Sequence, residues 1–224
     1  MKTSFFLNIL RLLPVLAAAL LTAPHTASAA TIVSNLGNAS DLGLWNIFHS
    51  GGGDSWVANS FTTGGSASLL NSITLGLPDS GAAAGGFSVS IYSDGGLAGP
   101  GTLLSTLTGA ANPATAGLYT YTAGTALALS ANTTFYLGLS LPLTGPDTSF
   151  DYQPTSDLTE SGTSGWSIGN SRWMSFNGGA SYFDSGPGDG ALKFSVDAAA
   201  IPEPSRALLL LGGLGTLFLR RRRK

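Results

Sequence analysis

The stretch from Leu69 to Leu77 reads LLNSITLGL, and its second half alternates between polar and apolar residues. Ile73, Leu75 and Leu77 would lie on one face of an extended chain, and the polar residues between them would lie on the other. This two-residue period predicts a β-strand with one buried face. Between residues 31 and 200, no run of about twelve residues carries apolar side chains at a helical period, so strands of this kind determine the fold.

The same alternation returns along the chain. It occurs in Phe87–Ile91, Leu103–Leu107, Leu127–Leu129, Phe135–Leu141 and Leu192–Val196. Clusters rich in Gly, Asp, Asn and Pro separate such segments, and clusters of this composition mark turns. We therefore predict about eight to ten half-buried strands in an all-β domain over residues 30–200, an antiparallel β-sandwich of the jelly-roll type.

The charges are distributed unevenly along the chain. Residues 31–200 contain two basic residues, Arg172 and Lys193, against eleven acidic ones, a formal net charge of −9, whereas the whole chain carries −2. An acidic surface repels phosphate backbones, so we expect no nucleic-acid partner. The chain has no Cys, which excludes thiolate catalysis, Cys-ligated zinc and disulfides.

The N-terminus has the layout of an export signal. Lys2 and Arg11 precede an apolar stretch, which is followed by small residues that end in Ala27-Ser28-Ala29. This order is typical of a secretory signal peptide over residues 1–29, cut by signal peptidase so that the mature chain begins at Ala30 or Thr31. The alternative is an amphipathic N-terminal helix, but Pro14 and the small residues at the end of the segment count against it.

The C-terminus combines an apolar run with a basic end. The run extends from residue 207 to 219, and Arg220, Arg221, Arg222, Arg223 and Lys224 follow it. As a helix the run reaches about 20 Å, against a hydrocarbon core of about 30 Å. The aliphatic parts of the flanking arginine side chains would lengthen the apolar segment. Because basic residues tend to stay on the cytoplasmic side of the membrane, the domain is predicted to lie outside and the basic tail inside. A helix packed on the domain is the alternative.

Directly before this run stands Pro202-Glu203-Pro204, which should be extended and accessible because its prolines disfavour helix and sheet. The order of tripeptide, short apolar helix and basic end over residues 201–224 resembles the PEP-CTERM sorting signal of Gram-negative bacteria. The resemblance implies processing by exosortase, a membrane-embedded cysteine transpeptidase. It also implies export, transient anchoring in the inner membrane, and a final location at the cell surface or in the extracellular polysaccharide matrix.

The middle of the chain resembles a second family. The segments 56–62, 70–75, 89–94 and 129–137 are similar to the choice-of-anchor domains of the R type, and the resemblance spans residues 35–197. These are bacterial extracellular domains that precede different surface anchors. The family brings no catalytic residues to transfer. We therefore expect a non-catalytic surface protein with a structural or adhesive role, with extracellular polysaccharide as a candidate partner.

Two other functions remain open, and the first is carbohydrate binding on the same anchor. Trp166, Arg172 and Trp173, with Asn170, are close enough in sequence to build a sugar-binding surface, although tryptophans also fill cores. The second is a glycan-active enzyme. Glycoside hydrolysis needs two carboxylates, and the candidates are Glu160 with Asp151, Asp157 or Asp184, although acids in such loops more often serve solvation. His49, beside a glycine run, is interpreted as a loop residue.

No cofactor is expected. Calcium is the best-suited metal, because oxygen ligands suffice for it, and Asp184 with Asp189, or Asp147 with Asp151, offer such ligands. Neither pair has the spacing of a recognised calcium loop, so a resident metal is not predicted. Around the domain, the sequence predicts an N-terminal signal helix and a C-terminal hydrophobic helix.

Overall fold

The computed structural model describes residues 30–79, 86–163 and 165–201, which belong to one compact unit, Ala29–Ile201. The predicted signal helix, the Pro-Glu-Pro motif and the C-terminal hydrophobic helix lie outside the described residues. Within the described ranges, no helix is both long enough and apolar enough to cross a bilayer.

Thirteen strands and two short 3-10 turns make up the described chain. They are β1 (Ala30–Ser34), β2 (Trp45–Ser50), β3 (Gly53–Thr62), β4 (Ser68–Leu77), β5 (Ser88–Asp94), η1 (Gly96–Ala98), β6 (Pro100–Thr108), β7 (Gly117–Leu129), β8 (Thr134–Ser140), β9 (Thr148–Tyr152), β10 (Ser161–Gly162), β11 (Ser167–Ser175), β12 (Phe183–Asp184), η2 (Pro187–Asp189) and β13 (Phe194–Ala200). The all-β prediction is confirmed. The strands outnumber the prediction partly because β10 and β12 are two-residue edge strands with no alternation to detect.

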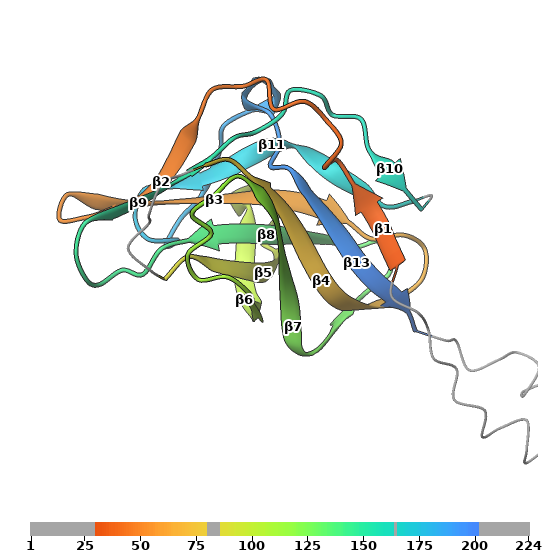
Figure 1. The fold of residues 1–224 in the computed structure, drawn as a ribbon. Helices are drawn as coiled ribbons and strands as arrows, with labels where there is room; N and C mark the ends of the chain where they lie inside the picture. Colours follow the sequence, from red (N-terminus) through yellow and green to blue (C-terminus); the bar gives the residue numbers. More distant parts are fainter. Residues whose placement is uncertain (1–29, 80–85, 164, 202–224) are drawn as a thin grey trace, which may run out of the picture. The chain divides into compact units, whose positions relative to one another are not determined.

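The strands form one antiparallel, curled sheet in the order β10-β1-β13-β4-β7-β6-β5-β8-β3-β11-β12 (Figure 1). β2 pairs with both β3 and β9 beside this path. β6 and β7 join through only the pairs Leu107–Ala123 and Thr108–Thr122, whereas β4 and β7 pair along the whole of β4. The β6–β7 contact is thus a narrow corner between two broad halves of the sheet.

The core lies between these halves. Phe61 of β3 stacks on Phe135 and Trp166 with ring centroids 5.8 and 6.5 Å away, and it meets the edge of Phe194 of β13 at 6.4 Å. Ile73 of β4 and its neighbours at 75 and 77 are buried, as the alternation predicts. Burying a side chain of this size contributes about 1.5 to 3 kcal/mol, so the two halves are held mainly by apolar contact.

β8 departs from the prediction of half-buried strands, because its residues 135–139 are buried on both faces. On the outer face, Tyr136 meets Trp173 of β11 edge-on at 5.9 Å. A Cβ at Gly138 would stand 2.7 Å from the Tyr92 ring, so this ring covers the strand directly. Aromatic side chains from neighbouring strands therefore replace solvent on the outer face.

Two buried asparagines hold the chain where it enters β13. Asn35 donates to the Leu192 carbonyl at 2.8 Å and accepts from the Phe194 amide at 2.7 Å. Asn59 of β3 accepts from the Leu192 amide at 2.9 Å and donates to the Gly169 carbonyl at 2.9 Å. Asn59 lies in β3 and Leu192 in the segment that leads into β13, so this amide side chain links the two halves of the sheet by hydrogen bonds.

The described chain begins and ends at the same end of the sheet. Ala30 of β1 pairs with Ala198 of β13, and Ala200 pairs with Ser68 at the start of β4. At the other end of these strands lie Leu77 and the segment that precedes Phe194, which we call the far end. A seven-residue strand such as β13 spans about 20 Å, which separates the two ends.

We predict that Asn59→Leu lowers the free energy of unfolding by about 2 to 5 kcal/mol. Leucine keeps the branched shape and the number of side-chain heavy atoms, but it leaves the buried Leu192 amide unpaired, at about 1 to 3 kcal/mol, and also removes the hydrogen bond to the partly buried Gly169 carbonyl, worth about 0.5 to 1.5 kcal/mol. Urea denaturation followed by tryptophan fluorescence measures the change. Asn112, which is exposed, provides the matched control, and Asn112→Leu should change stability by less than about 0.5 kcal/mol. Equal losses in the two variants would contradict the role of Asn59.

Candidate functional site: the groove beside Lys193

Two segments distant in sequence are tied together at the far end. Asn38 donates to the carbonyls of Asp157 and Thr159, both at 2.7 Å. The Ser156 amide donates to Asp41 at 2.8 Å, and the Ser156 hydroxyl donates to the same carboxylate. These hydrogen bonds lower the pKa of Asp41. Residues 35–44 are therefore fastened to residues 153–159 by several bonds.

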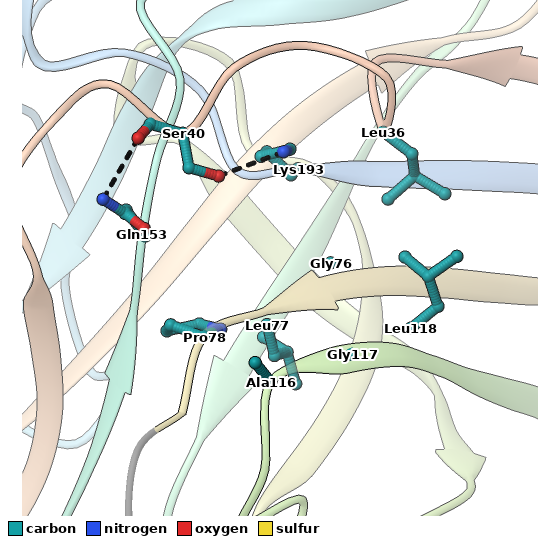
Figure 2. Close-up of a pocket in the computed structure, with 10 residues that line it drawn as sticks. All are labelled: Leu36, Ser40, Gly76, Leu77, Pro78, Ala116, Gly117, Leu118, Gln153 and Lys193. Atoms are coloured by element: carbon teal, nitrogen blue, oxygen red, sulfur yellow. Dashed lines mark hydrogen bonds between the residues drawn. The ribbon is translucent and has the colours of Figure 1, made fainter.

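A groove of about 330 Å³ opens beside these segments. Ten residues line it: Leu36, Ser40, Gly76, Leu77, Pro78, Ala116, Gly117, Leu118, Gln153 and Lys193. Figure 2 shows Leu36 and Leu118 together on one side, with Ser40 and Gln153 on the opposite side. Gln153 donates to the carbonyls of Ser40 and Leu42 at 3.2 and 2.9 Å, which fixes the polar side. The groove thus has an apolar side and a polar side.

Lys193 supplies the positive charge of the groove. Its carbonyl accepts from the Gly76 amide at 2.9 Å, and its Nζ donates to the Ser40 hydroxyl at 3.0 Å. The ion pairs among the described residues are His49–Asp54 and Arg172–Asp189, so in this part of the chain Lys193 has no carboxylate partner. An ammonium group has three donors, and the hydrogen bond to Ser40 uses one of them.

Gly76 keeps the floor of the groove open. A Cβ at this position would stand 3.3 Å from Cδ2 of Leu36, 3.5 Å from Cβ of Lys193 and 3.8 Å from Cδ2 of Leu118. A larger side chain would therefore occupy the space between the two leucines. The sequence presents Gly76 only as a polar position of a strand, and its role emerges from the neighbours that the fold supplies.

Arg172 is buried completely, which contradicts the prediction that it hydrogen-bonds sugars at the surface. Its guanidinium lies 4.3 Å from the ring centroid of Trp45, and Nη1 donates to the Tyr152 hydroxyl at 2.9 Å. Nη2 stands 3.8 Å from the Asp189 carboxylate, and neither Nε nor Nη2 has a hydrogen-bond partner within the described structure. Burial raises the pKa of Tyr152, while the nearby guanidinium acts in the opposite direction.

Trp166 and Trp173 point to opposite faces of the sheet and form no common surface. Trp166 is buried against Phe61 in the core. Trp173 packs on the outer face against Tyr136, and a Cβ at Gly99 would stand 2.2 Å from its ring. The alternative interpretation of tryptophans as packing residues therefore describes both side chains.

The acidic candidates are spread over several loops and strands. Asp184 accepts from the Gly186 amide at 2.8 Å, Asp147 from the Gly51 amide at 3.2 Å, and Glu160 from the Ile168 amide at 2.5 Å. Asp157 accepts from the Thr159 amide at 2.9 Å, and Asp151 lies in β9 opposite Asn46. Within the described ranges, no group of three or more acidic or histidine side chains is placed to hold a metal ion.

His49 forms a second polar cluster in the hairpin between β2 and β3. Its Nδ1 contacts Asp54, and both residues are partly buried. A shallow cavity of about 280 Å³ lies beside it, lined by residues 48–50 and 147–149. The contact orients the imidazole, a property that the interpretation of His49 as a solvent-facing loop residue did not foresee.

Comparisons with known proteins give no functional assignment. No family model matches the chain, and no curated protein matches it. Two similar solved structures are those of infectious bursal disease virus, Gt and Gx strains, with 15% and 12% identity and TM-scores of 0.28 and 0.30. The matches cover 78% and 80% of this chain but only 38% and 44% of the viral chains. This chain spans less than half of their length, and similarity this weak supports no inference.

We predict that Tyr152→Phe lowers the free energy of unfolding by about 1.5 to 3 kcal/mol, because a buried guanidinium loses its hydroxyl acceptor. In an Arg172→Met background the same change should cost less than about 0.5 kcal/mol, since no buried charge then needs the hydroxyl as an acceptor. Denaturant unfolding of the four proteins in this cycle gives the coupling energy. Equal costs in the two backgrounds would show that the hydrogen bond does not support Arg172.

Proposed function

We propose that this protein is exported, processed by exosortase, and displayed at the surface or in the extracellular matrix of a Gram-negative bacterium, where its domain has a structural or adhesive, non-catalytic role. The observation that carries the proposal is the contiguous order of Pro202-Glu203-Pro204, apolar run and basic end. The signal-peptide pattern at residues 1–29 is consistent with the same route.

The boundaries of the folded unit support this proposal. β1 begins at Ala30, directly after the expected signal cleavage site, and β13 ends at Ala200, two residues before Pro202. Cleavage at both places would leave every described strand complete. Loss of residues 1–29 and of the residues after Ile201 would therefore remove none of the described strand pairs.

The finer structural expectations belong to the same proposal. We infer that the curled sheet is a sandwich of the jelly-roll type, with its narrow corner at β6 and β7. We further propose that residues 1–29 and the apolar run form helices in the membrane before processing. In this arrangement the domain lies outside and the basic end lies in the cytoplasm.

We predict that the product isolated from producing cells begins at Ala30 or Thr31 and lacks Arg220–Lys224 when exosortase is present. Intact-mass spectrometry of the native protein measures both ends. In cells that lack exosortase, the same product should retain the basic end and remain in the membrane fraction. A product that retains Arg220–Lys224 in cells with exosortase would indicate a simple tail anchor and overturn the proposal.

The motif itself is tested by replacing Pro202 and Pro204 with Ala and Glu203 with Gln. This variant should accumulate as the unprocessed form, because the tripeptide that exosortase would recognise is lost. Ser205→Ala, next to the motif, provides the matched control and should be processed like the unaltered protein. Normal processing of the triple variant would contradict recognition of the tripeptide.

Carbohydrate binding is the second candidate function, and Trp45 is the observation that favours it. One face of this ring lies on the guanidinium of Arg172, and 40% of the residue remains exposed. A ring held flat by a buried cation is a preorganised platform for the apolar face of a sugar. Of the aromatic residues proposed from sequence, neither Trp166 nor Trp173 offers such a platform.

If this second function holds, Trp45→Ala should weaken polysaccharide binding about fivefold, the loss expected for one aromatic stack. Affinity gel electrophoresis in alginate and in dextran measures retardation with an acidic and a neutral polymer. Trp45→Phe retains a ring and should keep most of the binding, and Leu44→Ala, an exposed neighbour, should match the unaltered protein. Unchanged retardation of Trp45→Ala in both polymers would exclude this platform.

A further inference from the structure

We propose that the groove beside Lys193 binds the carboxylate of a small ligand whose body is apolar. The ammonium group and the Ser40 hydroxyl would hold the carboxylate, and the leucine side of the groove would cover the apolar body. The inference concerns only residues described in the structure, so it stands or falls independently of the sorting signal.

Charge is the first argument for a carboxylate. Residues 31–200 carry two cations, and the fold buries one of them, Arg172, beneath Trp45. Lys193 is thus the remaining cation of an acidic domain, and it lies in a groove with no described carboxylate paired to it. A charge-assisted hydrogen bond from the ammonium and one from a hydroxyl match the two oxygens of one carboxylate.

Shape is the second argument, and it defines the ligand body. Leu36 and Leu118 lie on the side of the groove away from Ser40 and Gln153 (Figure 2). Leu118 is 67% exposed, so an apolar ligand that covers it removes hydrophobic surface from water. The side-chain nitrogen of Gln153 already donates to two backbone carbonyls. Few polar groups of the lining are therefore left to hydrogen-bond several sugar hydroxyls. The lining therefore favours an aliphatic body over a sugar ring.

The pocket dimensions fit a ligand of this kind. A volume of about 330 Å³ is at the lower end of the range for small-molecule sites. The residues that line the groove come from the sheet and from the two segments that the hydrogen bonds of Asn38 and Ser156 join. A free aliphatic acid and the carboxyl terminus of an apolar peptide share the required chemistry, and they are distinguished by experiment.

Calorimetric titration of the protein as isolated, with sodium octanoate at low salt, tests the proposal. We expect saturable binding with a dissociation constant of about 1 mM or below, a range typical of weak small-ligand sites. Octylamine and octanol should bind at least tenfold more weakly, because the first reverses the charge and the second removes it. Equal binding of octanoate and octylamine, or tighter binding of glucuronate than of octanoate, would overturn the proposal.

Variants separate the two halves of the site. Lys193→Met keeps the straight apolar stem without the charge and should weaken octanoate at least tenfold, whereas Lys193→Arg should restore binding to within about threefold. Gly76→Val fills the groove with a residue suited to strands and should abolish binding. Thermal melting verifies that each variant folds. Unaltered octanoate binding in folded Lys193→Met or folded Gly76→Val would contradict the assignment.

Titration with a peptide distinguishes the two sources of the carboxylate. A short acetylated peptide that ends in leucine is titrated as the free acid and as the C-terminal amide. Binding of the free acid tighter than octanoate, with loss in the amide, assigns the groove to chain termini. Binding of octanoate alone assigns it to free aliphatic acids, and absence of binding by both ligands refutes the site.

Discussion

The backbone of Leu192–Phe194 is held from two directions by the side chains of Asn35 and Asn59, and much of the domain depends on these bonds. The hydrogen bonds of these side-chain amides fix the point at which β13 enters the sheet, and they link it to β3 across the core. Since Leu192 and Phe194 are buried, the residue between them must project to the other side. The same constraint that joins the two halves therefore places Lys193 over the groove.

The two cations of the domain, Arg172 and Lys193, have different environments: the first is packed in the interior and the second is in contact with solvent. Arg172 is planar, so it can stack beneath Trp45 while it donates to Tyr152, and burial is tolerable only with such partners. Lys193 is a compact charge on a flexible stem and remains accessible beside Ser40. Arg172 therefore belongs to the interior, and the electrostatic character of the far end depends on Lys193.

Alternation along single segments was sufficient to predict the strands that face the core, such as β4, β5 and β13. It did not predict β9, whose residues TSFDY alternate over too short a distance, nor the burial of both faces of β8, which depends on rings from other strands. The groove was equally hidden, because its lining comes from five separated parts of the chain. Such a site depends on register and on strand order, which no local period encodes.

The ends of the described chain lie far from the groove. Ala30 and Ala200 lie at one end of β1 and β13, while Lys193 and Gly76 lie at the other, about one strand length away. If the domain is held through residues that follow Ile201, as we propose, attachment and the groove occupy opposite ends of the same two strands. The separation also explains how loss of the tail could release the domain without altering its groove, since the strands that position Lys193 end before the processing motif begins.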